Sequence, residues 1–83
     1  MFEISFTPKA EQQLKKLEKE AQKRILAVLE RARVRPEAHF KRLVGEKAYR
    51  LRAGDYRIIA DINPNRLIIL VLKLGHRKNI YKK

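Results

Sequence analysis

The hydrophobic pattern divides the chain into one short alternating segment, two helical segments and a strand-rich second half. Phe2–Phe6 alternates apolar and polar residues, which predicts a strand with its apolar side chains on one face. Thr7 and Pro8 predict a helix start, because threonine caps the first N–H groups and proline is tolerated in the first turn. The chain therefore begins with a strand that leads directly into a helix.

Apolar residues then recur at helical spacing in two groups. The groups are Ala10, Leu14 and Leu17, followed by Ala21, Ile25, Val28, Leu29 and Ala32. A single helix from Pro8 to Arg33 would be about 39 Å long at 1.5 Å per residue, which exceeds the width of a small domain. We therefore expect a helical hairpin, with a break near Leu17–Glu20.

The second half predicts strands separated by short turns. Val34–Lys47 is expected to be a connector, in which Pro36 ends the second helix. Tyr49–Ala53 and Tyr56–Ile62 flank the dipeptide Gly54-Asp55, which is typical of a tight hairpin turn.

A second turn, Asn63-Pro64-Asn65, leads into Arg66–Leu74. This segment is apolar on both faces over six residues, which favours a central strand. The 83 residues leave room for one core only, so residues 1–83 are expected to be a single domain. The order of elements predicts an α+β fold: an N-terminal strand, two helices, and an antiparallel meander that completes one twisted sheet packed on the helices.

Composition narrows the class of protein. The chain has no cysteine, which excludes disulfides and thiolate metal sites, and its two histidines, His39 and His76, are too few for a structural zinc site. The first residues lack the pattern of a signal peptide, and the longest apolar run, Leu67–Leu72, is far shorter than the roughly 20 residues of a membrane span. We expect a cytoplasmic protein.

Charge is unevenly distributed. Residues 1–48 hold 12 basic and 7 acidic side chains, a net charge of +5, whereas residues 49–83 hold 9 basic and 2 acidic ones, a net charge of +7. A chain of net charge +12 is expected to bind an anionic partner, either nucleic acid, an acidic protein or a membrane surface. The sequence does not predict a long amphipathic helix with bulky aromatic residues, so a membrane is the least favoured of these partners.

Three arginines surround the predicted hairpin turn. Strand alternation places Arg50 and Arg52 on one face of the sheet and Leu51 on the other, and Arg57 follows on the partner strand. Leu51 and Ile58 suit the face that packs on the helices, so we expect the arginines on the opposite face. Charge that protects an edge strand would explain one arginine but not three. Guanidinium groups bind phosphate with paired hydrogen bonds, which favours RNA as the partner.

The segments "PKAEQQLKKL", "YRLRAGDYRII" and "LGHRKNIY" together resemble the RelE/ParE superfamily of toxins from toxin–antitoxin systems, and RelE messenger-RNA interferases most. The resemblance covers essentially the whole chain. It implies a small sheet packed on two helices and an endoribonuclease that enters the ribosomal A site and cuts the bound messenger RNA. It also implies that the RNA's own 2′-hydroxyl attacks, without a metal or other cofactor, and that an acidic antitoxin neutralises the toxin.

The resemblance also implies which residues form the site. Arg50 and Arg52 stand where well-studied RelE members have active-site lysines, and would bind RNA phosphate here. Arg57 matches the family's phosphate-contacting arginine, Arg77 the arginine after the glycine, and Tyr81 the C-terminal tyrosine. We expect these last three to be catalytic.

One departure from the family leaves the proton acceptor unassigned. Arginine stays protonated, so Arg50 and Arg52 cannot act as bases as lysines might. Histidine is the side-chain type that exchanges protons near neutral pH, and His76 is next to Arg77 in the sequence. We therefore expect His76 to take the proton from the 2′-hydroxyl. Lys78 is expected to bind RNA, and His39, in the connector, to be structural.

Two alternatives remain open. ParE-type toxins share the architecture but inhibit DNA gyrase by protein binding, and they generally lack the RelE catalytic set. A non-catalytic basic module that only binds RNA or an acidic protein is the other alternative. Such a module would tolerate loss of Arg77 or Tyr81 as long as the charge remained.

Overall fold

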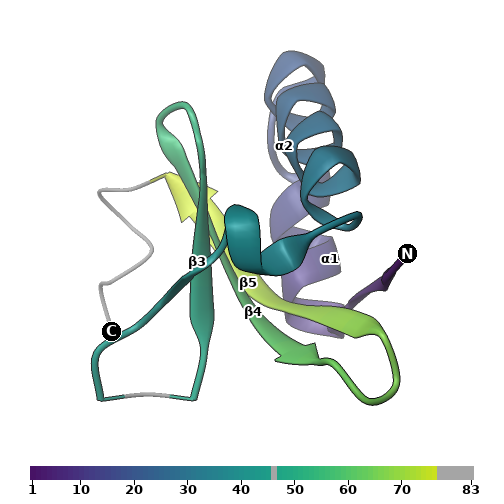
Figure 1. The fold of residues 1–83 in the computed structure, drawn as a ribbon. Helices are drawn as coiled ribbons and strands as arrows, with labels where there is room; N and C mark the ends of the chain where they lie inside the picture. The colour runs from purple at the N-terminus through teal and green to yellow at the C-terminus, as the bar shows by residue number, and fades with distance from the viewer. Residues whose placement is uncertain (46, 77–83) are drawn as a thin grey trace.

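The computed structural model describes residues 1–45 and 47–76. In this part of the chain a five-stranded sheet packs against two α-helices (Figure 1). The elements are β1 (Glu3–Phe6), α1 (Pro8–Lys15), α2 (Lys19–Ala32), the 3₁₀ turn η1 (Pro36–Ala38), β2 (Lys41–Arg42), β3 (Tyr49–Ala53), β4 (Tyr56–Asn63) and β5 (Ile68–His76). The α+β prediction is confirmed.

The strand order in the sheet is β1-β5-β4-β3-β2. The pairs β2–β3, β3–β4 and β4–β5 are antiparallel, whereas β1 pairs in parallel with β5, from Glu3 opposite Ile68 to Phe6 opposite Val71. Strand β5 therefore lies inside the sheet, as its apolar character on both faces predicts. The whole sheet is mixed, because the first strand returns to pair with the last.

Helix α1 begins as the sequence predicts. The Thr7 hydroxyl accepts a hydrogen bond from the Ala10 N–H (3.1 Å) and donates one to the Leu72 carbonyl of β5 (3.0 Å). The Gln13 side chain of α1 accepts a hydrogen bond from the Leu74 N–H (2.8 Å). These bonds tie α1 to β5 beyond the point where β1 ends.

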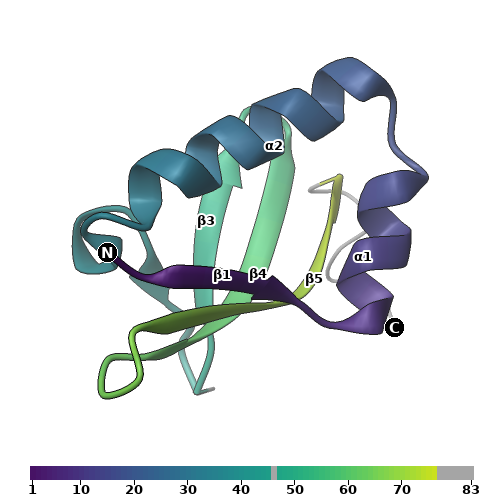
Figure 2. The ribbon, with the colours of Figure 1, turned by 90° about the vertical axis from the view of Figure 1, so that its right-hand side faces the viewer.

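The helical segment breaks between Lys15 and Lys19, within the expected region. The side-chain amide of Gln22 in α2 donates a hydrogen bond to the Leu17 carbonyl (2.8 Å), which closes the turn between the helices. Helix α1 contacts β5 and β1, and α2 contacts β3, so the two helices cover different parts of the same sheet face (Figure 2). No helix in the described ranges is long and apolar enough to cross a membrane.

The main core lies between this sheet face and the helices. Its fully buried large side chains come from both layers, and they are Ile25, Leu29, Ile58, Ile69, Val71 and Leu74. A much smaller apolar cluster lies on the opposite sheet face, where Leu43 and Leu72 pack against Ala48 and Ile59. The sheet therefore has one face that forms the core and one that is only partly apolar.

A β-bulge interrupts the pairing of β4 with β5. Ile59 lies opposite Lys73, but the next residue, Ala60, lies opposite Val71, so Leu72 is an extra residue in β5. As a result both Val71 and Leu74 face the helices, although a regular strand would place them on opposite faces. The bulge reverses the in–out alternation for the rest of β5.

The predicted boundaries need two corrections. The expected connector contains η1 and the two-residue strand β2, which pairs with the edge of β3. The last strand begins at Ile68, two residues later than expected, because Leu67 adopts a positive φ of 57° at the end of the preceding turn. It also ends two residues later than expected, at His76 instead of Leu74. The Asn63 side chain accepts hydrogen bonds from the backbone of Asn65 (3.0 Å) and Arg66 (3.1 Å), which confirms the predicted turn.

Candidate functional site

The β3–β4 hairpin has a two-residue turn at Gly54 and Asp55, since Ala53 pairs with Tyr56. Gly54 has a φ of 63°, as a type II′ turn requires at its first central position. The turn places Arg52 directly opposite Arg57. The Arg52 Nε also donates a hydrogen bond to the Gly54 carbonyl (3.2 Å), which helps to fix this arginine beside the turn.

The hairpin separates apolar and basic residues by face. Leu51 and Ile58 pair with each other and belong to the helix-side core. Arg50, Arg52 and Arg57 alternate with them and lie on the other face, as expected. Arg50 and Arg57 are half-buried, and the Arg57 Nε is fully buried. The backbone of all three arginines belongs to paired strands, so hydrogen bonds of the sheet hold their Cα positions in place.

The three arginines line one pocket of about 140 Å³ on this face. The other lining residues are Lys41, which pairs with Arg50 from β2, and His39, just before β2. All five lining residues are basic amino acids. We call this site the arginine pocket, defined by His39, Lys41, Arg50, Arg52 and Arg57.

His39 and Lys41 were not predicted as site residues. The turn η1 brings them there: the Pro36 carbonyl accepts hydrogen bonds from the His39 N–H (3.0 Å) and the Phe40 N–H (2.8 Å). Phe40 is buried in the main core and anchors the segment, while its neighbour His39 is exposed at the arginine pocket. The sequence signal that could have identified His39 is its position beside a buried aromatic residue and two residues before a basic one.

His76 does not line the arginine pocket. It pairs with Tyr56 across β4 and β5, and the two rings meet edge to face with centroids 5.8 Å apart. Tyr56 packs on the helix-side core, so His76 lies on that side of the sheet, away from the three arginines. The bulge at Leu72 is the cause, because regular alternation from Ile69 and Val71 would have placed His76 on the arginine face.

The remaining predicted site residues, Arg77, Lys78 and Tyr81, lie outside the described residues. Their assignments to catalysis and RNA binding stay predictions. The described part of the site therefore consists of the hairpin arginines with Lys41 and His39.

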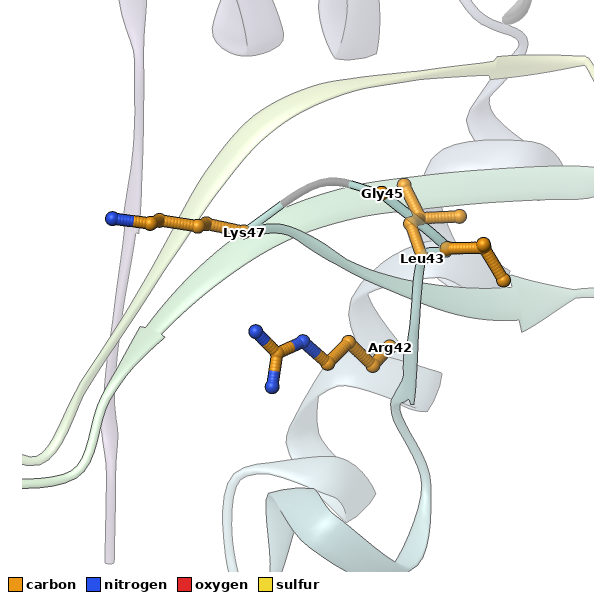
Figure 3. A pocket seen from close by; sticks show the side chains of 5 residues that line it. Arg42, Leu43, Gly45 and Lys47 are labelled. Carbon is orange, nitrogen blue, oxygen red and sulfur yellow. The ribbon is translucent and has the colours of Figure 1, made fainter.

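Two other hollows lie nearby. A shallow one of about 520 Å³ is lined by Arg42 at the end of β2 and by Leu43, Val44, Gly45 and Lys47 of the loop that follows (Figure 3). Val44 is fully exposed there, and the long side chains of Arg42 and Lys47 extend to the same side. Another, of about 320 Å³, is mainly apolar and includes Phe2 and Phe40. Neither hollow gathers charge as the arginine pocket does.

The geometry of the arginine pocket suits one anionic group. Its volume is below the roughly 300–1,000 Å³ typical of pockets for whole small molecules. Guanidinium groups held on neighbouring strands can bind the oxygens of a phosphate and stabilise charge that develops on them. The pocket can therefore hold a phosphodiester, with the rest of a nucleic-acid chain outside it.

Comparisons with solved structures identify the fold. The chain superposes on a toxin–antitoxin complex, RelBE2 of Mycobacterium tuberculosis, with a TM-score of 0.84 and 23% identity over 92% of this chain and 98% of that chain. The intact RelBE complex of E. coli gives a TM-score of 0.77 at 21% identity, covering 92% and 96%. The RelB–RelE complex of Methanococcus jannaschii gives 0.72 at 27% identity, covering 93% and 94%.

Sequence comparison gives the family. No curated protein sequence matches the chain. Residues 4–81, however, match the family model of the ParE toxin of type II toxin–antitoxin systems. Because this match covers nearly the whole chain, the protein belongs to the ParE toxin family of type II toxin–antitoxin systems and has a fold of the RelE type.

Proposed function

We propose that this toxin is a ribosome-dependent endoribonuclease that cleaves messenger RNA in the A site and so inhibits translation. The observation that carries the proposal is the arginine pocket, which three arginines of one hairpin line together. A surface that only attracted RNA would need positive charge but no such grouping of arginines in one pocket. Structures named RelE are similar to this chain, but at 21–23% sequence identity this similarity supports the proposal through the shared fold alone.

In the proposed reaction the 2′-hydroxyl of the RNA attacks the adjacent phosphorus. Arg50 and Arg52 hold the phosphate, and Arg57 stabilises the charge that develops on its oxygens in the transition state. Arg77 and Tyr81 are proposed to complete the catalytic set, and Lys78 to bind the RNA backbone. The proposed reaction uses no cofactor, and a toxin that acts on the ribosome would act in the cytoplasm.

The direct test is cleavage of a defined messenger RNA by purified toxin, mapped by primer extension, with and without programmed ribosomes. We expect cleavage at A-site codons and much slower cleavage of the same RNA free in solution, because the ribosome orients the scissile bond. Equal rates on naked and A-site RNA would contradict ribosome dependence. Absence of cleavage on both would contradict the nuclease.

The same proposal includes an acidic antitoxin as partner. The similar structures from M. tuberculosis, E. coli and M. jannaschii are complexes of a toxin with its antitoxin. A chain of net charge +12 is suited to a segment that lays acidic and apolar residues across the helices or a sheet edge. We expect the association rate to fall as salt rises. A rate that is insensitive to salt would contradict electrostatic steering.

Inhibition of DNA gyrase by protein binding is the second candidate. The match to a ParE family model favours it. A supercoiling assay with purified gyrase distinguishes the two candidate functions. If the toxin is the proposed nuclease, we expect no inhibition of gyrase at toxin concentrations that stop translation. Gyrase inhibition without messenger-RNA cleavage would decide for the second candidate.

A further inference from the structure

We propose that His39, rather than His76, accepts the proton from the attacking 2′-hydroxyl. The inference rests on the proposed function, and it assigns a catalytic role to a residue that sequence patterns left as structural. His39 lines the pocket in which the three hairpin arginines meet, whereas His76 lies against Tyr56 on the helix side of the sheet. A proton acceptor has to be within hydrogen-bond reach of the hydroxyl it deprotonates, so the shared pocket decides between the two histidines.

The position of His39 is set by the fold. The turn η1 and the buried side chain of Phe40 hold the segment against the sheet edge, and β2 pairs with β3 two residues later. His39 is exposed, so its ring can meet a phosphodiester that enters the arginine pocket. A residue anchored on both sides but exposed itself is well placed to act on a bound substrate.

The other groups that line the pocket cannot easily take this role. Lys41 from β2, Arg50 and Arg52 from β3, and Arg57 from β4 face the pocket together with His39. Arginine stays protonated, and lysines that act as bases are typically buried, whereas Lys41 is exposed. Glu37, two residues before His39, lines the separate apolar hollow, and its Oε1 lies 4.0 Å from the Arg35 Nε. Among these residues imidazole is the side chain suited to exchange protons near neutral pH.

In the proposed step one bond to phosphorus forms and one breaks, with one proton moved on each side. The 2′-oxygen forms a bond to phosphorus while its proton passes to an imidazole nitrogen of His39. The bond from phosphorus to the 5′-oxygen breaks, and this oxygen takes a proton from solvent, which leaves a 2′,3′-cyclic phosphate and a 5′-hydroxyl. His39 then returns its proton to solvent. The arginines neutralise the charge on the non-bridging oxygens throughout.

The test is single-turnover cleavage on programmed ribosomes over a range of pH, with toxin in excess. Wild-type cleavage is expected to rise with pH and level off, as for a base that must be deprotonated. His39→Gln is expected to lower the plateau by roughly 10²–10⁴-fold, the usual loss for a general base, and to remove the rise. His39→Arg keeps a positive charge but cannot accept a proton, so it is expected to be as slow as His39→Gln. His76→Gln is expected to keep the rise with pH.

Four results would overturn the assignment, and one of them would also overturn the proposed function. If the wild-type toxin does not cut messenger RNA at all, both the proposed function and the role of His39 are wrong. If His39→Gln cuts as fast as the wild type, with the same pH profile, only the role of His39 is wrong. Recovery of the rate by His39→Arg would make His39 a phosphate contact, and loss of the pH-dependent rise in His76→Gln would return the role to His76. Thermal unfolding of each variant checks that it is folded, which is expected for His39 because its side chain is exposed.

Discussion

The two faces of the sheet use the same strands for different purposes. On the face toward the helices, Ile58 is completely buried among residues from both layers. On the opposite face, its neighbour Arg57 lines the arginine pocket. Because side chains alternate along a strand, consecutive residues of one hairpin belong to the core and to the site.

The two faces of the sheet are expected to respond differently to substitution. A substitution on the helix side is expected to act on the free energy of unfolding, and one in the arginine pocket on the rate of cleavage. The separation is possible because the core lies almost entirely on one face, while the other face carries only the small cluster around Ile59. Four sets of variants test how complete this separation is.

The largest effect is expected for Ile58→Ala. The substitution leaves a cavity in the main core, and such changes cost about 2–5 kcal/mol of the free energy of unfolding. Ile59→Ala, in the small cluster on the other face, is the matched control and is expected near the lower end of that range, because its surroundings can relax more easily. Chemical denaturation of both variants measures the difference. Equal losses would contradict the view that one face dominates stability.

Arg57→Ala is expected to lower the rate of cleavage on the ribosome by about 10²–10³-fold, as for loss of one donor to a transition-state oxyanion. The midpoint of thermal unfolding is expected to change little. Arg31→Ala, which removes an exposed arginine from α2, is the control for loss of charge and is expected to retain cleavage. Undiminished cleavage by folded Arg57→Ala would remove this residue from the site.

Gly54→Ala examines the turn that places Arg52 opposite Arg57. The backbone φ of 63° is costly for alanine, by about 1–2 kcal/mol. The added methyl would also displace the Arg24 side chain, whose Nη1 lies 2.6 Å from the position of the new atom. We expect a fall in the melting temperature of about 4–8 °C per kcal/mol. Gly54→Asn is expected to lose less, since asparagine tolerates this conformation better.

Thr7→Ala is expected to have the smallest effect, about 1 kcal/mol, through loss of the helix cap. Its second hydrogen bond, to the Leu72 carbonyl, adds to the loss. Thr7→Ser keeps the hydroxyl and is expected to restore most of the stability in a thermal melt. Cleavage is expected to be unchanged in both, because Thr7 lies on the helix side. A loss of cleavage without a loss of stability would couple the two faces.

Local patterns predicted the first helix and the hairpin that carries the three arginines. Thr7 and Pro8 begin α1, and the hairpin forms around Gly54 and Asp55, because capping and tight turns depend on neighbouring residues. Strand alternation also separated the arginines from the apolar residues of β3 and β4. These predictions were correct since each needs only a few consecutive residues.

The sequence by itself therefore determined the α+β class, the capped helix, the hairpin and the grouping of three arginines on one face. Tertiary structure decided which residues join them. The pairing of β2 with β3, seen only in the folded chain, brings His39 and Lys41 to the arginine pocket. The extra residue Leu72 reverses the alternation of β5 and turns His76 toward the helices. Both depend on how distant strands pair, and a one-residue change in register moves every following side chain to the other face.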